Sequence, residues 1–365
     1  MMKTVLSILV GGLLVFLSFE CSSQGVEENV LKWENNQLNL GAVMEENGEV
    51  TVDYYFENKE DFPVIIDEVV TDCGCTTIEY SKDTLFKDEK GLVKVKFDPQ
   101  YRGGTFSKMI LVKTNIDTTG DSLFLEGVNI PYPEDVEQHY KIRKGGLGFV
   151  FPVNNLGTIF SNKTKIKYLD FYNFSENPIQ LNQIQPGLSE HLHVKMTPPV
   201  VPSEERGVLE IGFDPTIKKE LGFIEEEISL SVLSLERFDV SLQFVATLHE
   251  HFEPVPISKI DSVPRLELEE PEVDLGKISS RTKVNKRLTL ENVGGEILNI
   301  RKIVTNCNCL TFDLPKYDLQ MGESIDLTME FDPEGRRGID HKTLTIFSND
   351  PLNPTRTILI KSRID

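Results

Sequence analysis

Short runs of alternating or continuous apolar residues recur along most of the chain and predict β-strands. Residues 50–56, 91–97 and 108–114 follow this pattern over strand lengths, and Asn, Asp, Gly and Pro bracket them. The same holds for three later runs, at 284–290, 324–331 and 342–347. Helical periodicity is weak throughout. Regularly spaced strands with turn signals between them are typical of β-sandwiches.

A sequence unit of roughly 100 residues, the usual size of an immunoglobulin-like sandwich, recurs three times. Each unit carries the same motifs in the same order: Leu-Gly at 40–41, 156–157 and 275–276; a triplet ending in Asn at 56–58, 171–173 and 290–292; and Phe-Asp-Pro at 97–99, 213–215 and 331–333. Cys75 and Asp98 are 23 positions apart, as are Cys309 and Asp332. The register predicts an all-β chain of three tandem immunoglobulin-like β-sandwich domains, at 33–132, 145–248 and 265–365.

The Phe-Asp-Pro motif has a local physical reason. Phe closes a strand inside the core, Asp bonds its own downstream backbone, and Pro ends the ladder because it has no N–H. Between the units, residues 131–146 and 254–264 are charged and contain proline. That composition predicts semi-stiff spacers.

The N-terminus is typical of an export signal. Lys3 precedes an apolar run at 5–17, which is too short to span a bilayer that needs about 20 helical residues. We predict a signal peptide at 1–20 and a tether at 21–32. Cys21 resembles the lipidated residue of a bacterial lipoprotein, although Glu20 departs from the small residue preferred before it. The alternative is an ordinary cleaved signal with an incidental cysteine.

Charge and composition narrow the function further. The formal net charge of −20, from 58 acidic and 38 basic residues, argues against nucleic-acid binding, which needs basic surface. It also argues against direct docking on anionic headgroups. We therefore expect an exported protein in the periplasm or at the cell surface, whose membrane contact is a lipid on Cys21, anchored to the outer membrane.

The remaining cysteines form two close pairs, Cys73 with Cys75 and Cys307 with Cys309. An extended strand holds such residues near the upper Cα distance for a disulfide, so a bridge requires a kink, which Gly74 or Asn308 would tolerate. A three-residue loop would contribute only ~1.6 kcal/mol by chain entropy. Three interpretations stay open: a reducible disulfide, a two-thiolate site for Cu(I) or Zn, and a pair of small buried apolar residues.

These motifs are similar to those of the bacterial DUF1573 family, a domain of unknown function with immunoglobulin-like repeats. The resemblance rests on Cys-Gly-Cys-Thr at 73–76 and the later Phe-Asp-Pro, and it covers 38–130 and 273–365, with Asn308 in place of Gly. The second unit has Ser189-Glu190-His191 where the cysteines would lie. The resemblance implies an exported β-sandwich, often a lipoprotein of Bacteroidetes-type bacteria, and implies no activity.

Other candidate sites carry weaker signals. Two His-x-His pairs, 191–193 and 249–251, form at most half of a metal site, and we predict no metal. Four Asp-Ser/Thr sequences resemble the O-glycosylation pattern of Bacteroidetes secreted proteins, with acceptors Thr84, Thr118, Ser122 and Ser262.

No catalytic motif accompanies the repeats: the sequence has no nucleophile elbow, phosphate-binding Gly loop or zinc-protease helix. We therefore predict no enzyme activity and no cofactor, and a role as an interaction or scaffold module for other envelope proteins. The alternative is a periplasmic thiol- or copper-handling protein that uses the two cysteine pairs. A carbohydrate-binding module is a weaker third alternative, because the single Trp33 lies ahead of the repeated pattern.

Overall fold

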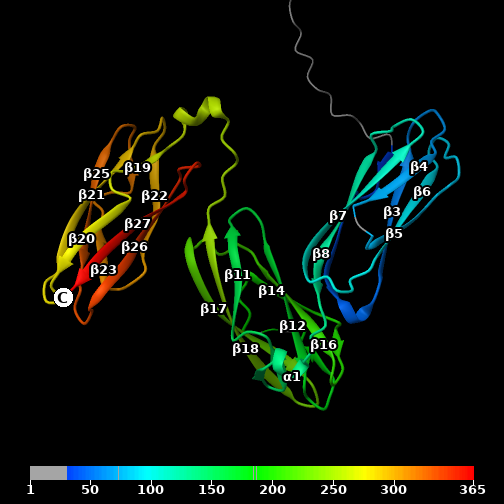
Figure 1. The fold of residues 1–365 in the computed structure, drawn as a ribbon, viewed down its shortest axis with the longest axis horizontal. Coiled ribbons are helices and arrows are strands. Elements are labelled where there is room, and N and C mark those ends of the chain that lie inside the picture. Colours follow the sequence, from blue (N-terminus) through cyan, green and yellow to red (C-terminus); the bar gives the residue numbers. More distant parts are fainter. Residues whose placement is uncertain (1–30, 73, 184, 186) are drawn as a thin grey trace, which may run out of the picture. The chain divides into compact units, whose positions relative to one another are not determined.

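The structure, a computed structural model, describes residues 31–72, 74–183, 185 and 187–365, and these residues are almost entirely β (Figure 1). They form six sheets and two compact units, which divide between Tyr132 and Pro133. The predicted all-β, sandwich-like fold is confirmed, and the division into three domains stays a prediction. No helix in the described ranges is long and apolar enough to cross a membrane.

The first compact unit contains one pair of sheets around one apolar cluster. The first sheet has the order β1 (Leu31–Trp33), β3 (Val50–Asn58), β6 (Lys90–Phe97), β5 (Thr76–Tyr80). The second has the order β2 (Gln37–Met44), β8 (Asp121–Ile130), β7 (Gly104–Thr114), β4 (Ile66–Thr71), with a short 3-10 helix η1 (Glu45–Asn47) after β2.

The second compact unit contains two further pairs of sheets, each around its own apolar cluster. The earlier pair consists of β14 (Leu192–Thr197), β16 (Arg206–Phe213), β12 (Lys165–Asn173), β10 (Leu147–Phe149), β9 (Ile142–Lys144), and of β11 (Val153–Phe160), β18 (Arg237–His249), β17 (Gly222–Leu233), β13 (Ile179–Leu181), β15 (Val200–Val201). The later pair consists of β19 (Leu266–Leu268), β21 (Val284–Asn292), β25 (Ser324–Phe331), β23 (Leu310–Asp313), and of β20 (Glu272–Ile278), β27 (Thr355–Ile364), β26 (Gly338–Ser348), β22 (Leu298–Thr305), β24 (Asp318–Leu319). Two short helices, α1 (Val136–His139) and η2 (Ile257–Ser262), precede the two pairs.

The Leu-Gly motif marks a bulge in each sheet pair. Gly41, Gly157 and Gly276 all have positive φ, where a side chain would be strained. Each sits at a register shift in a parallel pairing, and its N–H donates to an Asn or Asp side chain two residues earlier, over 2.7–2.8 Å. The glycine is therefore required by the backbone, which explains why it recurs.

The Phe-Asp-Pro motif behaves as the sequence predicts. Phe97, Phe213 and Phe331 are each 1% exposed. Burying a phenylalanine completely contributes about 1.5–3 kcal/mol. The Asp side chain accepts from the backbone N–H two residues later in every unit, over 2.9–3.1 Å.

The asparagine that ends each triplet is fully buried, at 0% exposure for Asn58, Asn173 and Asn292. The Nδ2 of Asn292 donates to the carbonyls of Glu296 and Leu319, at 2.8 and 3.0 Å, and its Oδ1 accepts from the N–H of Gly294. Asn58 and Asn173 make the same contacts with their own loops. One amide thus satisfies several backbone groups where two loops meet the core.

The residue two positions before this asparagine varies together with its cross-strand neighbour. Phe56 lies opposite Gly91, and Phe171 lies opposite Gly207. A Cβ on Gly91 would lie 2.2 Å from the Phe56 ring, so the ring occupies the space above the glycine. In the third unit Leu290 faces Ile325. A phenylalanine that faces a glycine, which has no side chain, is thus replaced by two side chains of intermediate size. The total side-chain volume packed at this place stays similar.

Two sequence-based boundaries need correction. The spacer expected to reach Gly146 ends earlier, because β9 pairs with β10 and Tyr140 is completely buried. The expected tether at 21–32 also ends earlier, since Leu31 begins β1 and is 1% exposed. Trp33, in the same strand, packs on Phe56 with ring centroids 4.9 Å apart. Trp33 is therefore part of the sandwich and not ahead of it.

We predict that Asn292→Ala lowers the free energy of unfolding by ~2–4 kcal/mol, because buried carbonyls lose their donor and Gly294 loses its acceptor. Urea unfolding followed by fluorescence or circular dichroism measures this. The matched control is Asn285→Ala, at an exposed position of the same strand. Equal unfolding midpoints for the two variants would contradict the structural role of the buried amide.

We predict a pH-dependent effect of Asp121→Asn. Burial raises the pKa of Asp121 above its ordinary value of 3.8, although the Trp33 indole donates to its Oδ2 at 2.8 Å. The folded state therefore disfavours the charged carboxylate, and this cost is absent at low pH and sets in as the pH rises past 3.8. In thermal melts, the melting temperature of Asp121→Asn relative to that of the wild type should rise as the pH is raised from 3 to 7. A flat difference would refute the assignment.

Candidate functional site

Cys75 and the pair Cys307 and Cys309 lie where the chain crosses from one sheet to the other. In the third of the repeated sequence units, at 265–365, β22 ends at Thr305 in the sheet with β26. β23 begins at Leu310 in the sheet with β25. Between them, the N–H of Leu310 donates to the Cys307 carbonyl at 3.2 Å, and the N–H of Asp332 donates to the Cys309 carbonyl at 2.8 Å. The crossover is therefore a tight turn that is hydrogen-bonded to the first residue of β23 and to the residue directly after β25.

A second set of bonds fixes the beginning of the turn. The backbone N–H of Asn306 donates to the Thr343 carbonyl at 3.2 Å, and the Asn306 Oδ1 accepts from the N–H of Thr343 at 3.0 Å. Thr343 lies in β26. The turn is thus held from both sheets, which fixes the position of the cysteine side chains.

Cys307 and Cys309 form a disulfide, with their Cα atoms 5.2 Å apart. The turn supplies the kink that a bridge between alternate residues requires. It does so without a left-handed residue, since Asn308 is not among the positions with positive φ. Both cysteines of this pair are only half-buried.

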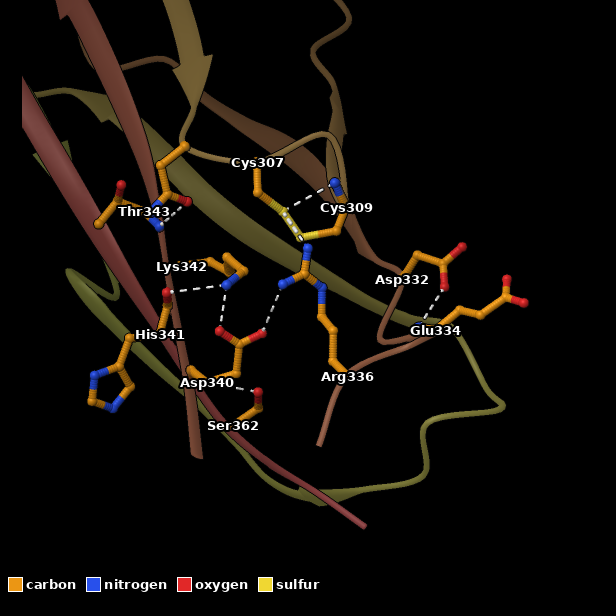
Figure 2. Close-up of polar contacts among 11 residues, drawn as sticks. Cys307, Cys309, Asp332, Glu334, Arg336, Asp340, His341, Lys342, Thr343 and Ser362 are labelled. Carbon is orange, nitrogen blue, oxygen red and sulfur yellow. Dashed lines mark hydrogen bonds and ion pairs between the residues drawn. A yellow bond between two sulfur atoms is a disulfide. The ribbon is translucent and has the colours of Figure 1, made fainter. Parts of the chain in front are cut away.

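An arginine reaches the disulfide from the loop that follows Phe-Asp-Pro (Figure 2). The Arg336 Nη2 lies 3.7 Å from the Cys307 Sγ, and its Nη1 lies 3.7 Å from the Asp340 Oδ2. Asp340 also pairs through its Oδ1 with Lys342. The Cys307 Sγ accepts a second hydrogen bond, from the backbone N–H of Cys309 at 3.0 Å. One sulfur of the disulfide therefore faces both a positive charge and an N–H dipole.

The ion pair between Asp340 and Lys342 is largely shielded from water, whereas the side chain of Arg336 is 36% exposed. The side chains of Asp340 and Lys342 are 16% and 11% exposed. The Asp340 Oδ2 is buried with no hydrogen bond of its own, so its nearest compensation is the guanidinium of Arg336. Attraction between charges is stronger where water is excluded. Asp340 therefore holds Arg336 against Cys307.

The first cysteine pair has different surroundings. Cys75 is 4% exposed and is disulfide-bonded, and Cys73 lies outside the described residues. Arg102 and Phe106 occupy the positions that match Arg336 and Asp340. Arg102 is exposed, and Phe106 stacks on Phe97 with centroids 4.3 Å apart. An aromatic ring thus replaces the carboxylate that anchors the arginine in the third unit.

The second unit has no thiol at this place. His191 matches Cys309, and its carbonyl accepts from the N–H of Asp214 at 2.7 Å, as in the other units. Its ring lies 2.8 Å from the Glu226 carboxylate, which also pairs with Lys218. His191 immediately precedes β14, which contains His193, and the His191 ring is paired with Glu226.

The other candidate residues are scattered. Cys21 lies outside the described residues. Thr84, Thr118 and Ser262 are exposed, and Ser122 is half-buried within β8. In the second histidine pair, His249 ends β18 and His251 lies beyond it, beside Glu253. No group of three or more His, Cys, Asp or Glu side chains suited to a metal ion occurs among the described residues. Glycosylation and the absence of a metal stay predictions.

Sequence reasoning missed Arg336 and Asp340. The offset that relates Cys75 to Cys309 also relates Arg102 to Arg336. That match was a usable signal for an arginine near the cysteines. The contact itself depends on Asp340, which has no counterpart in the first unit.

Comparison with known proteins gives a family but no function. A family model described as "Protein of unknown function (DUF1573)" matches residues 31–129 and 266–364. Among curated proteins, none matches the chain. These two ranges are the units that carry the cysteine pairs.

Solved structures resemble the chain only distantly. A protein of unknown function from Porphyromonas gingivalis W83 is 19% identical over 60% of this chain and 100% of that chain, with a TM-score of 0.44. An endo-fucoidan hydrolase, MfFcnA4, is 13% identical over 82% of this chain and 39% of its own, with a TM-score of 0.21. A PapD-like domain of human CEP192 is 10% identical over 32% of this chain and 94% of its own, with a TM-score of 0.25. Likenesses this distant identify no function.

We predict that the Cys307–Cys309 disulfide contributes little to stability, since its loop is so short: about 1.6 kcal/mol at most by chain entropy. Cys307→Ser with Cys309→Ser should fold and lose no more than this in urea unfolding. The oxidised wild-type protein with and without reductant provides the comparison. A loss of several kcal/mol, or failure to fold, would show that the disulfide is a structural requirement.

Proposed function

Because this chain belongs to the DUF1573 family, whose function is unknown, we propose that it is a non-catalytic protein of the cell envelope that binds other proteins through its sheet edges. The observation that carries the proposal is a set of open edges. β5, β14 and β23 each end a sheet and pair on one side only. Unpaired strand edges accept extended segments of partners by strand addition.

The three edges are equivalent in register. In antiparallel pairing, alternate residues direct their backbone groups to the neighbouring strand. The carbonyls of Cys75, His191 and Cys309 accept from the neighbouring strand's Asp, so the residues three positions later direct theirs outward. Those residues are Ile78, Val194 and Phe312, and all three are half-buried. A partner strand would therefore meet the same arrangement at each edge.

Location is part of the proposal and rests on the sequence. The leader at 1–20 and the cysteine at 21 support export and a lipid anchor, in the periplasm or at the cell surface. The outer membrane is the membrane we propose. The net charge of −20 supports proteins as partners, and not nucleic acid or anionic headgroups.

The Arg336–Cys307 contact favours a second candidate function, the handling of thiols. A positive charge beside a cysteine stabilises its thiolate, which is the reactive form. The same pair, once reduced, would offer two soft ligands to Cu(I), which is the copper-handling version of this function. Both versions use the half-buried pair of the third unit more readily than the buried Cys75.

We predict that proline at an outward-facing edge position removes a bound partner, since proline has no N–H to offer an added strand. Tagged full-length protein with Ile78→Pro, Val194→Pro or Phe312→Pro is cross-linked in its native envelope, and co-purifying proteins are quantified by mass spectrometry. At least one variant should lose wild-type partners about tenfold, the equivalent of ~1.4 kcal/mol.

The matched controls are Ile78→Val, Val194→Ile and Phe312→Tyr, which keep the backbone N–H and should retain every partner. Partners that survive all three prolines would exclude strand addition. A turnover abolished by one point mutation of the purified protein would exclude the non-catalytic role.

A further inference from the structure

We propose that the Cys307–Cys309 disulfide is a thiol–disulfide exchange site with a fixed direction: an incoming thiolate attacks Cys309, and Cys307 leaves. This inference rests on the second candidate function, thiol handling, and specifies its substrate class and the role of each sulfur. It is carried by the unequal surroundings of the two sulfur atoms.

The asymmetry is set by hydrogen-bond donors. The Cys307 Sγ receives the backbone N–H of Cys309 at 3.0 Å and faces the Arg336 Nη2 at 3.7 Å. Among the described residues, no hydrogen bond has the Cys309 Sγ as its acceptor. Exchange is faster when the leaving sulfur is the better-stabilised thiolate. Cys307 is therefore the leaving group and Cys309 the electrophile.

The charges around the disulfide support a thiolate at Cys307. Arg336 and Lys342 are positive and share Asp340 as their one close carboxylate. His341 points away from the disulfide, and so do Asp332 and Glu334 (Figure 2). Asp332 is also engaged elsewhere, since it pairs with Lys283 at 3.7 Å. A thiolate formed at Cys307 would complete the charge balance of this cluster.

The exchange balances in two steps. A substrate thiolate attacks the Cys309 Sγ and forms a mixed disulfide, the Cys307–Cys309 bond breaks, and its electron pair stays on Cys307 beside Arg336. A second substrate thiolate then attacks the substrate sulfur of the mixed disulfide, and Cys309 leaves and takes up a proton. Two thiols have been oxidised to one disulfide, and the protein disulfide has been reduced by the same two electrons.

The first cysteine pair provides an internal contrast. Cys75 is 4% exposed, and Phe106 takes the place of Asp340, the carboxylate that pairs with Arg336 in the third unit. An incoming thiol therefore has little access to Cys75. The structure thus assigns exchange to the pair of the third unit.

The test uses detergent-purified full-length protein and reduced glutathione as the probe. The reaction is quenched with an alkylating agent, and peptide mapping by mass spectrometry locates each adduct. We expect glutathione on Cys309 and the alkyl group on Cys307. Glutathione on Cys307, or modification of the 73/75 pair at an equal rate, would overturn the assignment.

Variants test the role of Arg336. Arg336→Gln should slow exchange about tenfold, as expected when a thiolate loses its charge partner, and Arg336→Lys should recover part of the rate. In the reduced protein, half-maximal alkylation of Cys307 should move to higher pH in Arg336→Gln, a change that a purely structural role would not produce. Arg102→Gln, the matched control, should change neither measurement. Unchanged kinetics in Arg336→Gln would refute the role of the arginine.

The outcomes separate this inference from the binding function. If the protein keeps its envelope partners but its 307–309 pair does not react with glutathione, the exchange site is refuted and the binding function is not. If the protein exchanges thiols but the proline variants keep every partner, strand addition is refuted and the exchange site is not. If Arg336→Gln fails to fold, the adduct positions in the wild type and the rate of Arg336→Lys still decide the question.

Discussion

Each sandwich depends on a chain segment that leaves one sheet and enters the other, over a few residues in the first and third units and over a longer stretch between β13 and β14 in the second. The backbone groups of this crossover cannot join either ladder, so they must find partners in the turn or in the adjacent strand. The carbonyl just before the new strand always accepts from the Asp of Phe-Asp-Pro, in all three units. That bond sets where β5, β14 and β23 begin and therefore which residues face outward along each open edge.

The same crossover explains the cysteine pairs. A turn brings Cys307 and Cys309 to a Cα separation of 5.2 Å, which suits a disulfide, while the second unit makes the same backbone bond with His191 and no thiol. The fold therefore does not need the disulfide at this place. Its short loop has little chain entropy to remove, and its half-buried position beside an arginine is consistent with the proposed exchange site.

The three units share the same buried backbone contacts but differ in the side chains that pack around them. Asn58, Asn173 and Asn292 make the same buried contacts, because in each unit the same two loops bring backbone carbonyls to the buried amide. Positions that only fill space have changed in pairs, such as Phe56 with Gly91 against Leu290 with Ile325. The site has diverged most, since Asp340 faces Arg336 where the first unit has Phe106. Function can thus differ between units that share a fold.

The sequence by itself determined the strands, the threefold repeat, and the places where Gly, Asn and Phe-Asp-Pro recur, because these follow from local backbone needs and from periodicity that a single unit displays. It also marked the cysteine pairs as unusual. Only the tertiary structure decided that Trp33, Leu31 and Tyr140 belong to sheet pairs, and that Arg336 and Asp340 converge on Cys307. Those contacts join segments about 30 to 90 residues apart in the chain, and a pattern read along one segment carries no information about which distant side chain fills the space beside it.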